Sequence, residues 1–133
     1  DLFAGSGALG FEAASNGAQA VTFVEPGKSA AAALSENIKR LGAQNCTVAQ
    51  TRAEHFIESA ASPFDIIFLD PPYQQPELLD RALNALSERT LINGYVYLEA
   101  SNEEMLLDLC ARFHLAPQKT THAGSTFSVL ASL

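Results

Sequence analysis

Apolar residues recur along this chain of 133 residues with two different periods. Short apolar runs typical of strands occur at 20–24, 46–50, 64–69 and 95–99, and residues 1–3 have the pattern of a strand that has already begun. Between these runs the apolar residues return every three or four positions, which predicts helices at 8–16, 28–41, 53–60, 76–89 and after Asn102, a residue that can cap a helix. The segments 114–121 and 125–131 flank Gly124, and alternation in the second predicts an antiparallel hairpin.

Apolar stripes support the two longest predicted helices. Leu34, Ile38 and Leu41 share one face of 28–41, with Gly42 as the helix end, and Leu79, Leu83 and Leu86 share one face of 76–89. Residues 64–69 are apolar except for Asp65, which is typical of a strand covered on both faces of a parallel sheet.

This alternation of strands and helices predicts one α/β domain over residues 1–133. We expect a Rossmann-like, doubly wound, mostly parallel sheet with right-handed crossovers and a C-terminal antiparallel hairpin. Strands average ~5 to 6 residues, so the first strand should begin before Asp1. We therefore expect the chain to be a fragment that lacks its N-terminal part.

Composition narrows the possible classes of protein. With 47% apolar and 17% charged residues the chain should fold, and no apolar run approaches the ~20 residues of a membrane span. No signal peptide is recognisable, so the expected location is the cytoplasm.

Cys46 and Cys110 are predicted to be buried free thiols, and the histidines have no metal-ligand spacing, so no metal is expected. A net charge of −7 means that any nucleic acid must be held by a local patch or from outside this chain.

A glycine loop follows the first predicted strand. Gly5, Gly7 and Gly10 form a G-x-G-x-x-G pattern between a strand and a helix. Glycine allows the backbone to approach a ligand closely, and the helix start offers free N–H groups. Glu25, at the end of the next strand, can accept hydrogen bonds from both ribose hydroxyls. Together these features fit a cofactor that contains adenosine.

The segment Asp70-Pro71-Pro72-Tyr73 follows the strand at 64–69. In the expected topology it faces the glycine loop, since ligands bind beyond the carboxyl ends of parallel strands. Two prolines fix the backbone and remove two N–H donors, which leaves outward carbonyls as rigid acceptors. The Asp70 carboxylate, the Pro71 carbonyl and the Tyr73 ring can clamp a planar amine, a group that hydride transfer does not require.

These motifs resemble those of class I methyltransferases that use S-adenosylmethionine. Residues 1–7 are similar to motif I, and D-P-P-Y is similar to the motif of amino-methyltransferases. Together with V-Y-L-E at 96–99 and the terminal hairpin, they resemble the RsmD-type 16S rRNA guanine-N2 methyltransferases along the whole chain. The resemblance implies that motif I, which includes Asp1 and Phe3, binds the cofactor with Gly5 and Gly7 at its methionine end. It also implies that Glu25 binds the ribose, and that Asp70 and Tyr73 face the target base. Asp70 is expected to contact the cofactor as well.

Some positions depart from the family pattern. Arg52 stands where many relatives have Asp or Asn for the adenine amine, so adenine would depend on the Ala53 N–H group and on Glu54. Pro26 is expected to make the ribose edge of the pocket smaller. The basic N-terminal extension that the family carries to help hold RNA is absent from this sequence.

The implied function is methylation of a guanine N2 amine in 16S rRNA. The implied partner is small-subunit rRNA or an assembling ribosomal subunit, with no membrane or metal, and a monomer is expected. Three alternatives stay open. The same clamp serves DNA adenine-N6 or protein glutamine methylation, G-x-G-x-x-G with Glu25 also fits a nicotinamide-dependent oxidoreductase, and truncation could leave a non-catalytic binding domain.

Overall fold

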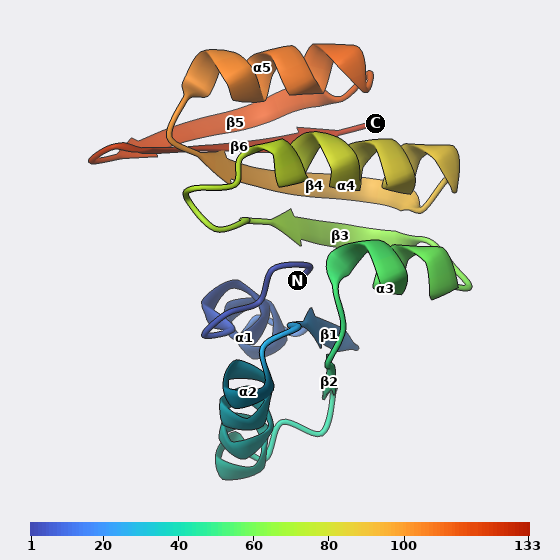
Figure 1. The fold of residues 1–133 in the computed structure, drawn as a ribbon, viewed down its shortest axis with the longest axis vertical. Helices are drawn as coiled ribbons and strands as arrows, with labels where there is room; N and C mark the ends of the chain where they lie inside the picture. Colours follow the sequence, from blue (N-terminus) through green and yellow to red (C-terminus); the bar gives the residue numbers. More distant parts are fainter. The chain divides into compact units, whose positions relative to one another are not determined.

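A computed structural model describes residues 1–133, with helices and strands in the predicted alternation (Figure 1). The helices are α1 (Ala8–Ser15), α2 (Lys28–Leu41), α3 (Ala53–Ser59), α4 (Glu77–Glu88) and α5 (Glu103–Arg112). The strands are β1 (Val21–Val24), β2 (Cys46–Ala49), β3 (Phe64–Leu69), β4 (Ile92–Ala100), β5 (Ala116–Ala123) and β6 (Thr126–Ser132). The chain forms two compact units, Asp1–Phe56 and Ile57–Leu133. None of its helices is long and apolar enough to cross a bilayer.

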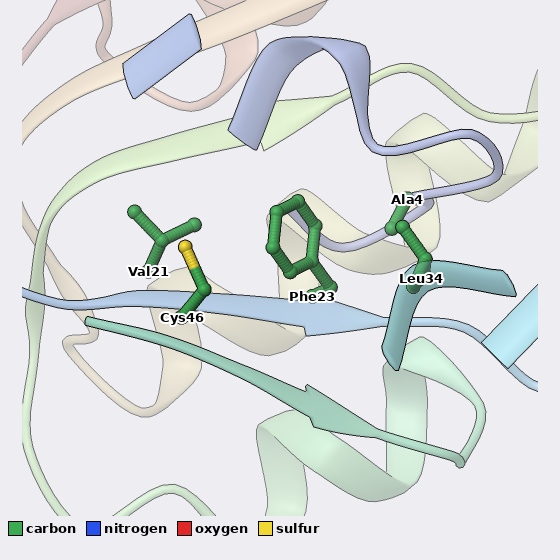
Figure 2. Packing of buried hydrophobic residues seen from close by; sticks show 5 residues of the cluster. All are labelled: Ala4, Val21, Phe23, Leu34 and Cys46. Carbon is green, nitrogen blue, oxygen red and sulfur yellow. The ribbon is translucent and has the colours of Figure 1, made fainter. Parts of the chain in front are cut away.

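The first unit is built on the parallel pair of β1 and β2, against which α1 and α2 pack. Figure 2 shows Phe23 of β1 in the middle of a buried apolar cluster with Ala4, Val21, Leu34 and Cys46. This cluster fixes the two segments that follow Phe3 and Val24. These segments carry four of the predicted cofactor residues, namely Gly5, Gly7, Glu25 and Pro26.

The predicted strand at residues 1–3 is wrong as a regular element. Leu2 and Phe3 form a turn, and on either side of it Asp1 and Ala4 bond to β1, with the Ala4 N–H donating to the Val24 carbonyl at 3.1 Å. The Asp1 amino group donates to the Thr22 carbonyl at 3.0 Å, and the Val24 N–H donates to the Asp1 carbonyl at 2.9 Å. These two bonds hold Asp1 at the end of β1 although the chain turns immediately afterwards.

The second unit contains a four-stranded sheet in the order β3-β4-β6-β5. β3 and β4 are parallel, and the hairpin of β5 and β6 adds antiparallel strands, as the sequence predicts. Helices α4 and α5 pack against this sheet (Figure 1). The buried face of the central strands carries Ile67, Leu69, Val96, Leu98 and Val129. The helices cover this face through Leu79, Leu83, Leu86, Leu106 and Leu109, all of which are buried.

The opposite face of this sheet is more open. Ile66 pairs with Tyr95 in the β3–β4 register, and the Ile66 side chain is 51% exposed. The expectation that β3 is covered on both faces is therefore wrong at its N-terminal half.

Two smaller predictions are confirmed. The predicted thiols Cys46 and Cys110 are buried and free, and the Asn102 side chain caps α5 by accepting from the Met105 N–H at 3.0 Å.

Candidate functional site

The glycine loop requires glycine at two positions for packing and leaves open space at the third. At Gly10 a Cβ would lie 2.3 Å from the Phe23 ring. Gly7 begins α1 with φ 83°, and a Cβ there would lie 2.6 Å from the Leu34 side chain and 2.8 Å from Phe11. Gly5 also has a positive φ of 52°, but a Cβ there would meet nothing within 4 Å. The loop is therefore packed on its inner side at Gly7 and open at Gly5, where a ligand can approach the main chain.

Glu25 connects the glycine loop to the turn that follows β1. Its Oε1 accepts from the Gly5 N–H at 3.1 Å, and its Oε2 accepts from the Gly27 N–H at 2.7 Å. Each carboxylate oxygen can accept more than one hydrogen bond, so both can still bind a hydroxyl group. Glu25 thus has a structural role that the sequence did not reveal, in addition to its predicted role at the ribose.

Asp1 has one satisfied and one unsatisfied carboxylate oxygen. Its Oδ2 accepts from the Gly10 N–H at 3.1 Å, whereas the buried Oδ1 has no hydrogen-bond partner. A buried acceptor without a partner is costly, so it fits a ligand that carries a donor such as an ammonium group.

The other predicted cofactor residues are more dispersed. Phe3 is half-buried, Pro26 and Arg52 are exposed, and Ala53 is buried in the first turn of α3. The structure therefore joins Asp1, Glu25 and the glycine loop by hydrogen bonds, and none of these bonds includes Arg52 or Ala53.

The second group of site residues lies in the other unit, at the carboxyl ends of β3 and β4. Leu69 pairs with Leu98 in parallel register, so the residues that follow them, Asp70 and Glu99, come next to each other. Both line a pocket of about 100 Å³, together with Pro71, Pro72, Tyr73, Pro76, Ala100, Ser101 and Thr126. The pocket contains two carboxylates and no lysine or arginine, so it favours a ligand rich in hydrogen-bond donors.

Burial and, to a lesser extent, the negative charge of Glu99 together raise the pKa of the Asp70 carboxyl to about 6. Asp70 is therefore mostly ionised at neutral pH but close to its titration range. Carboxyl groups with raised pKa values in a pocket are frequent at functional sites.

The two prolines do not contribute equally. The Pro72 carbonyl accepts from the Gln75 N–H at 2.9 Å, so the expectation of two outward carbonyls is wrong at this position. No protein donor bonds to the Pro71 carbonyl, which remains available beside Asp70. The Tyr73 side chain is 65% exposed, so its ring is accessible for stacking on a planar ligand.

Glu99 is the site residue that sequence reasoning missed. It was part of the V-Y-L-E resemblance, but no role was assigned to it. The Tyr97 hydroxyl, two residues earlier on the same face of β4, donates to Glu99 Oε2 at 2.9 Å. The signal that identifies Glu99 is the β3–β4 register, which a single sequence does not contain.

No three His, Cys, Asp or Glu side chains gather closely enough to hold a metal ion.

Comparison with known proteins places the chain in a family. Residues 1–130 match the family described as conserved hypothetical protein 95. Ribosomal RNA small subunit methyltransferase D of Buchnera aphidicola is 36% identical over 110 residues, which cover 80% of this chain and 57% of that protein. The protein of the same name from Escherichia coli is 33% identical over 121 residues, 90% of this chain and 61% of its own.

A solved structure agrees with this result. The candidate methyltransferase yhhF from Escherichia coli superposes with a TM-score of 0.88 at 30% identity, and the match covers 99% of this chain and 73% of that one. The chain spans about three fifths of the length of the two curated relatives. These findings confirm the predicted α/β methyltransferase fold and the resemblance to RsmD-type proteins: the chain belongs to the conserved hypothetical protein 95 family.

Proposed function

We propose that the full-length protein transfers a methyl group from S-adenosylmethionine to the exocyclic N2 amine of a guanine in small-subunit rRNA. The observation that carries this proposal is the pocket in which Asp70, the Pro71 carbonyl and the exposed Tyr73 ring lie together. The names of the similar proteins support the substrate class, because two of them are called small subunit rRNA methyltransferases.

The acceptors of the pocket address a specific difficulty of the reaction. The guanine amine is a poor nucleophile, since its lone pair is delocalised into the ring. Hydrogen bonds from its two N–H groups to Asp70 and the Pro71 carbonyl favour a pyramidal nitrogen with its lone pair directed at the methyl group. The ionised carboxylate also stabilises the positive charge that develops on nitrogen. Tyr73 stacks on the base and keeps it in the pocket.

The residues of the first unit fit the proposed cofactor. The unpartnered Asp1 Oδ1 can accept from an ammonium group, Gly5 leaves the main chain accessible, and Glu25 can accept from ribose hydroxyls. S-adenosylmethionine supplies a methyl group that is already activated on a sulfonium centre. The chain then contributes orientation and electrostatics, and none of these roles requires a metal.

The proposed partner is small-subunit rRNA or an assembling ribosomal subunit. With a net charge of −7, residues 1–133 attract phosphates weakly, so we expect much of the RNA affinity to come from other parts of the protein.

The test is methyl transfer by the full-length protein with labelled S-adenosylmethionine. RNA, DNA and protein fractions from a strain that lacks the enzyme serve as substrates, and the labelled nucleoside is identified after digestion. We expect N2-methylguanosine in small-subunit RNA, with a rate that falls as salt rises. Asp70→Ala should lower transfer at least ~100-fold while cofactor affinity stays within a few-fold of wild type. Label only in DNA or in protein would refute the ribosomal substrate.

A further inference from the structure

The proposed clamp leaves one carboxylate of the pocket unused. Asp70 and Glu99 occupy neighbouring positions beyond the paired residues Leu69 and Leu98, and both line the pocket. The charge of Glu99 raises the pKa of Asp70, so the two carboxylates repel each other and this repulsion destabilises the folded chain. A second carboxylate beside the first therefore needs a ligand donor of its own.

Hydrogen bonds fix the orientation of Glu99 from one side. The Tyr97 hydroxyl donates to Oε2 at 2.9 Å, while no protein group donates to Oε1. Thr121 Oγ1 is hydrogen-bonded to the Oγ of the buried Ser128. In the β6 register Ser128 pairs with both Glu99 and Thr121, so these polar side chains share one face of the sheet across three strands. Glu99 is thus held through one oxygen, and its other oxygen is without a protein donor in a residue that lines the pocket.

The acceptors of the pocket can be matched to the donors of a base. Guanine presents three N–H bonds on one edge, two on N2 and one on the ring nitrogen N1. Adenine and cytosine present an amine of two N–H bonds, but the adjacent ring nitrogen carries a lone pair. A glutamine side chain has two amide N–H bonds and no third donor beside them. Asp70 and the Pro71 carbonyl account for two acceptors, and Glu99 is the third.

We propose that Glu99 accepts the N1–H of the target guanine and thereby selects guanine over bases with an acceptor at that position. This inference rests on the proposed function, because it names the group that recognises the proposed substrate. A base with a lone pair at N1 would face the carboxylate directly, and buried groups left unpaired in this way discriminate strongly between substrates.

The test compares two RNA substrates with the full-length enzyme. One carries guanosine at the position where the methyl-transfer test locates the label. The other carries 2-aminopurine riboside there, which keeps the exocyclic amine but has a lone pair at N1. Wild type should prefer guanosine at least ~100-fold in kcat/KM. In Glu99→Gln the Tyr97 hydroxyl still donates to the side-chain oxygen, so the amide NH2 group turns to the pocket and donates to N1 of 2-aminopurine. The preference should then shrink at least ~10-fold, mostly through a lower rate with guanosine.

Controls separate recognition from folding. Glu104→Gln removes the same charge from an exposed position in the first turn of α5, outside the pocket, and should keep the wild-type preference. Cofactor affinity of Glu99→Gln, measured by calorimetry, should stay within a few-fold of wild type. If this variant does not fold, Tyr97→Phe provides a second test, since it leaves the carboxylate but removes its fixed orientation and should narrow the preference by a smaller factor.

Each outcome has a definite meaning. An unchanged preference in Glu99→Gln, even with a lower overall rate, would mean that Glu99 only supports the structure, and it would overturn the inference. A wild-type enzyme that accepts 2-aminopurine as well as guanosine would overturn it too. Both results leave the proposed function intact, whereas the absence of guanine methylation by wild type would refute that function first and the inference with it.

Discussion

Asp70→Asn is expected to stabilise the fold at pH 8 and to have a much smaller effect on stability at pH 4. The pKa of Asp70 is raised from 3.8 to about 6 by burial and by the charge of Glu99, so the folded chain disfavours the ionised form. Above pH 6 the carboxyl is ionised in both the folded and unfolded states, and the folded state bears the full penalty. At pH 4, close to the unfolded pKa of 3.8, the carboxyl is protonated in the folded state and partly protonated in the unfolded state, so most of the penalty has disappeared.

The magnitude follows from the size of the shift. A change of about two pKa units corresponds to at most about 3 kcal/mol. Asp70 is only partly buried and solvent screens its charge, so a gain of about 1 kcal/mol is the reasonable expectation. For a domain of this size that gain raises Tm by about 3 to 5 °C at pH 8.

Thermal unfolding followed by circular dichroism, at pH 8 and pH 4 on the full-length protein, measures this difference. Asp65→Asn is a matched control, because Asp65 is exposed on the same strand β3 and loses the same charge. An equal gain at both pH values would refute the reasoning, since it would attribute the effect to packing and not to ionisation. A lower Tm at pH 8 would refute it as well.

Two further predictions concern the cofactor half. Gly7→Ala should lower the free energy of unfolding by at least about 2 kcal/mol in denaturant titrations, because its Cβ would overlap Leu34 and Phe11. Gly5→Ala has open space around the new Cβ, so it should lower the free energy of unfolding by only about 1 kcal/mol. An equal cost at both glycines would contradict this packing argument. Glu25→Ala should weaken S-adenosylmethionine binding by roughly 1.5 to 3 kcal/mol in calorimetry and lower Tm, since two N–H groups lose their acceptor; unchanged affinity would exclude Glu25 from the cofactor site.

Local periodicity predicted the elements well because helices and strands depend on neighbouring residues. The stripe of Leu79, Leu83 and Leu86 is fully buried, as expected, but Leu41 at the end of the other stripe is 67% exposed. The reason is length: α2 has 14 residues and extends about 21 Å, whereas the four residues of β2 extend about 13 Å. A helix this much longer than its neighbouring strand extends beyond it, and a helical pattern does not report where the supporting sheet ends.

The errors at the sheet have a common cause. The apolar run of β3 did not indicate which face the helices cover, and Ile66 lies on the face opposite to that covered by α4 and α5. Glu99 was missed for the same reason, since its position next to Asp70 depends on a register between strands far apart in sequence. The D-P-P-Y motif was recognisable because its four residues are contiguous. That motif I and D-P-P-Y act on the same ligand stays a prediction.

The neighbouring carboxylates explain why a pocket that is unfavourable for the isolated chain can be useful. Asp70 and Glu99 repel each other beside the Phe68 and Tyr97 rings, which pack edge to face at 6.0 Å. Substituting either acid by its amide should relieve this repulsion, and a ligand with matching N–H donors relieves it as well. The relief from a ligand is lost when one donor is replaced by a lone pair. The repulsion between Asp70 and Glu99 therefore lowers the stability of the free protein but increases the difference in affinity between a guanine edge and its competitors. Substitution of either residue by its amide should raise stability and lower selectivity.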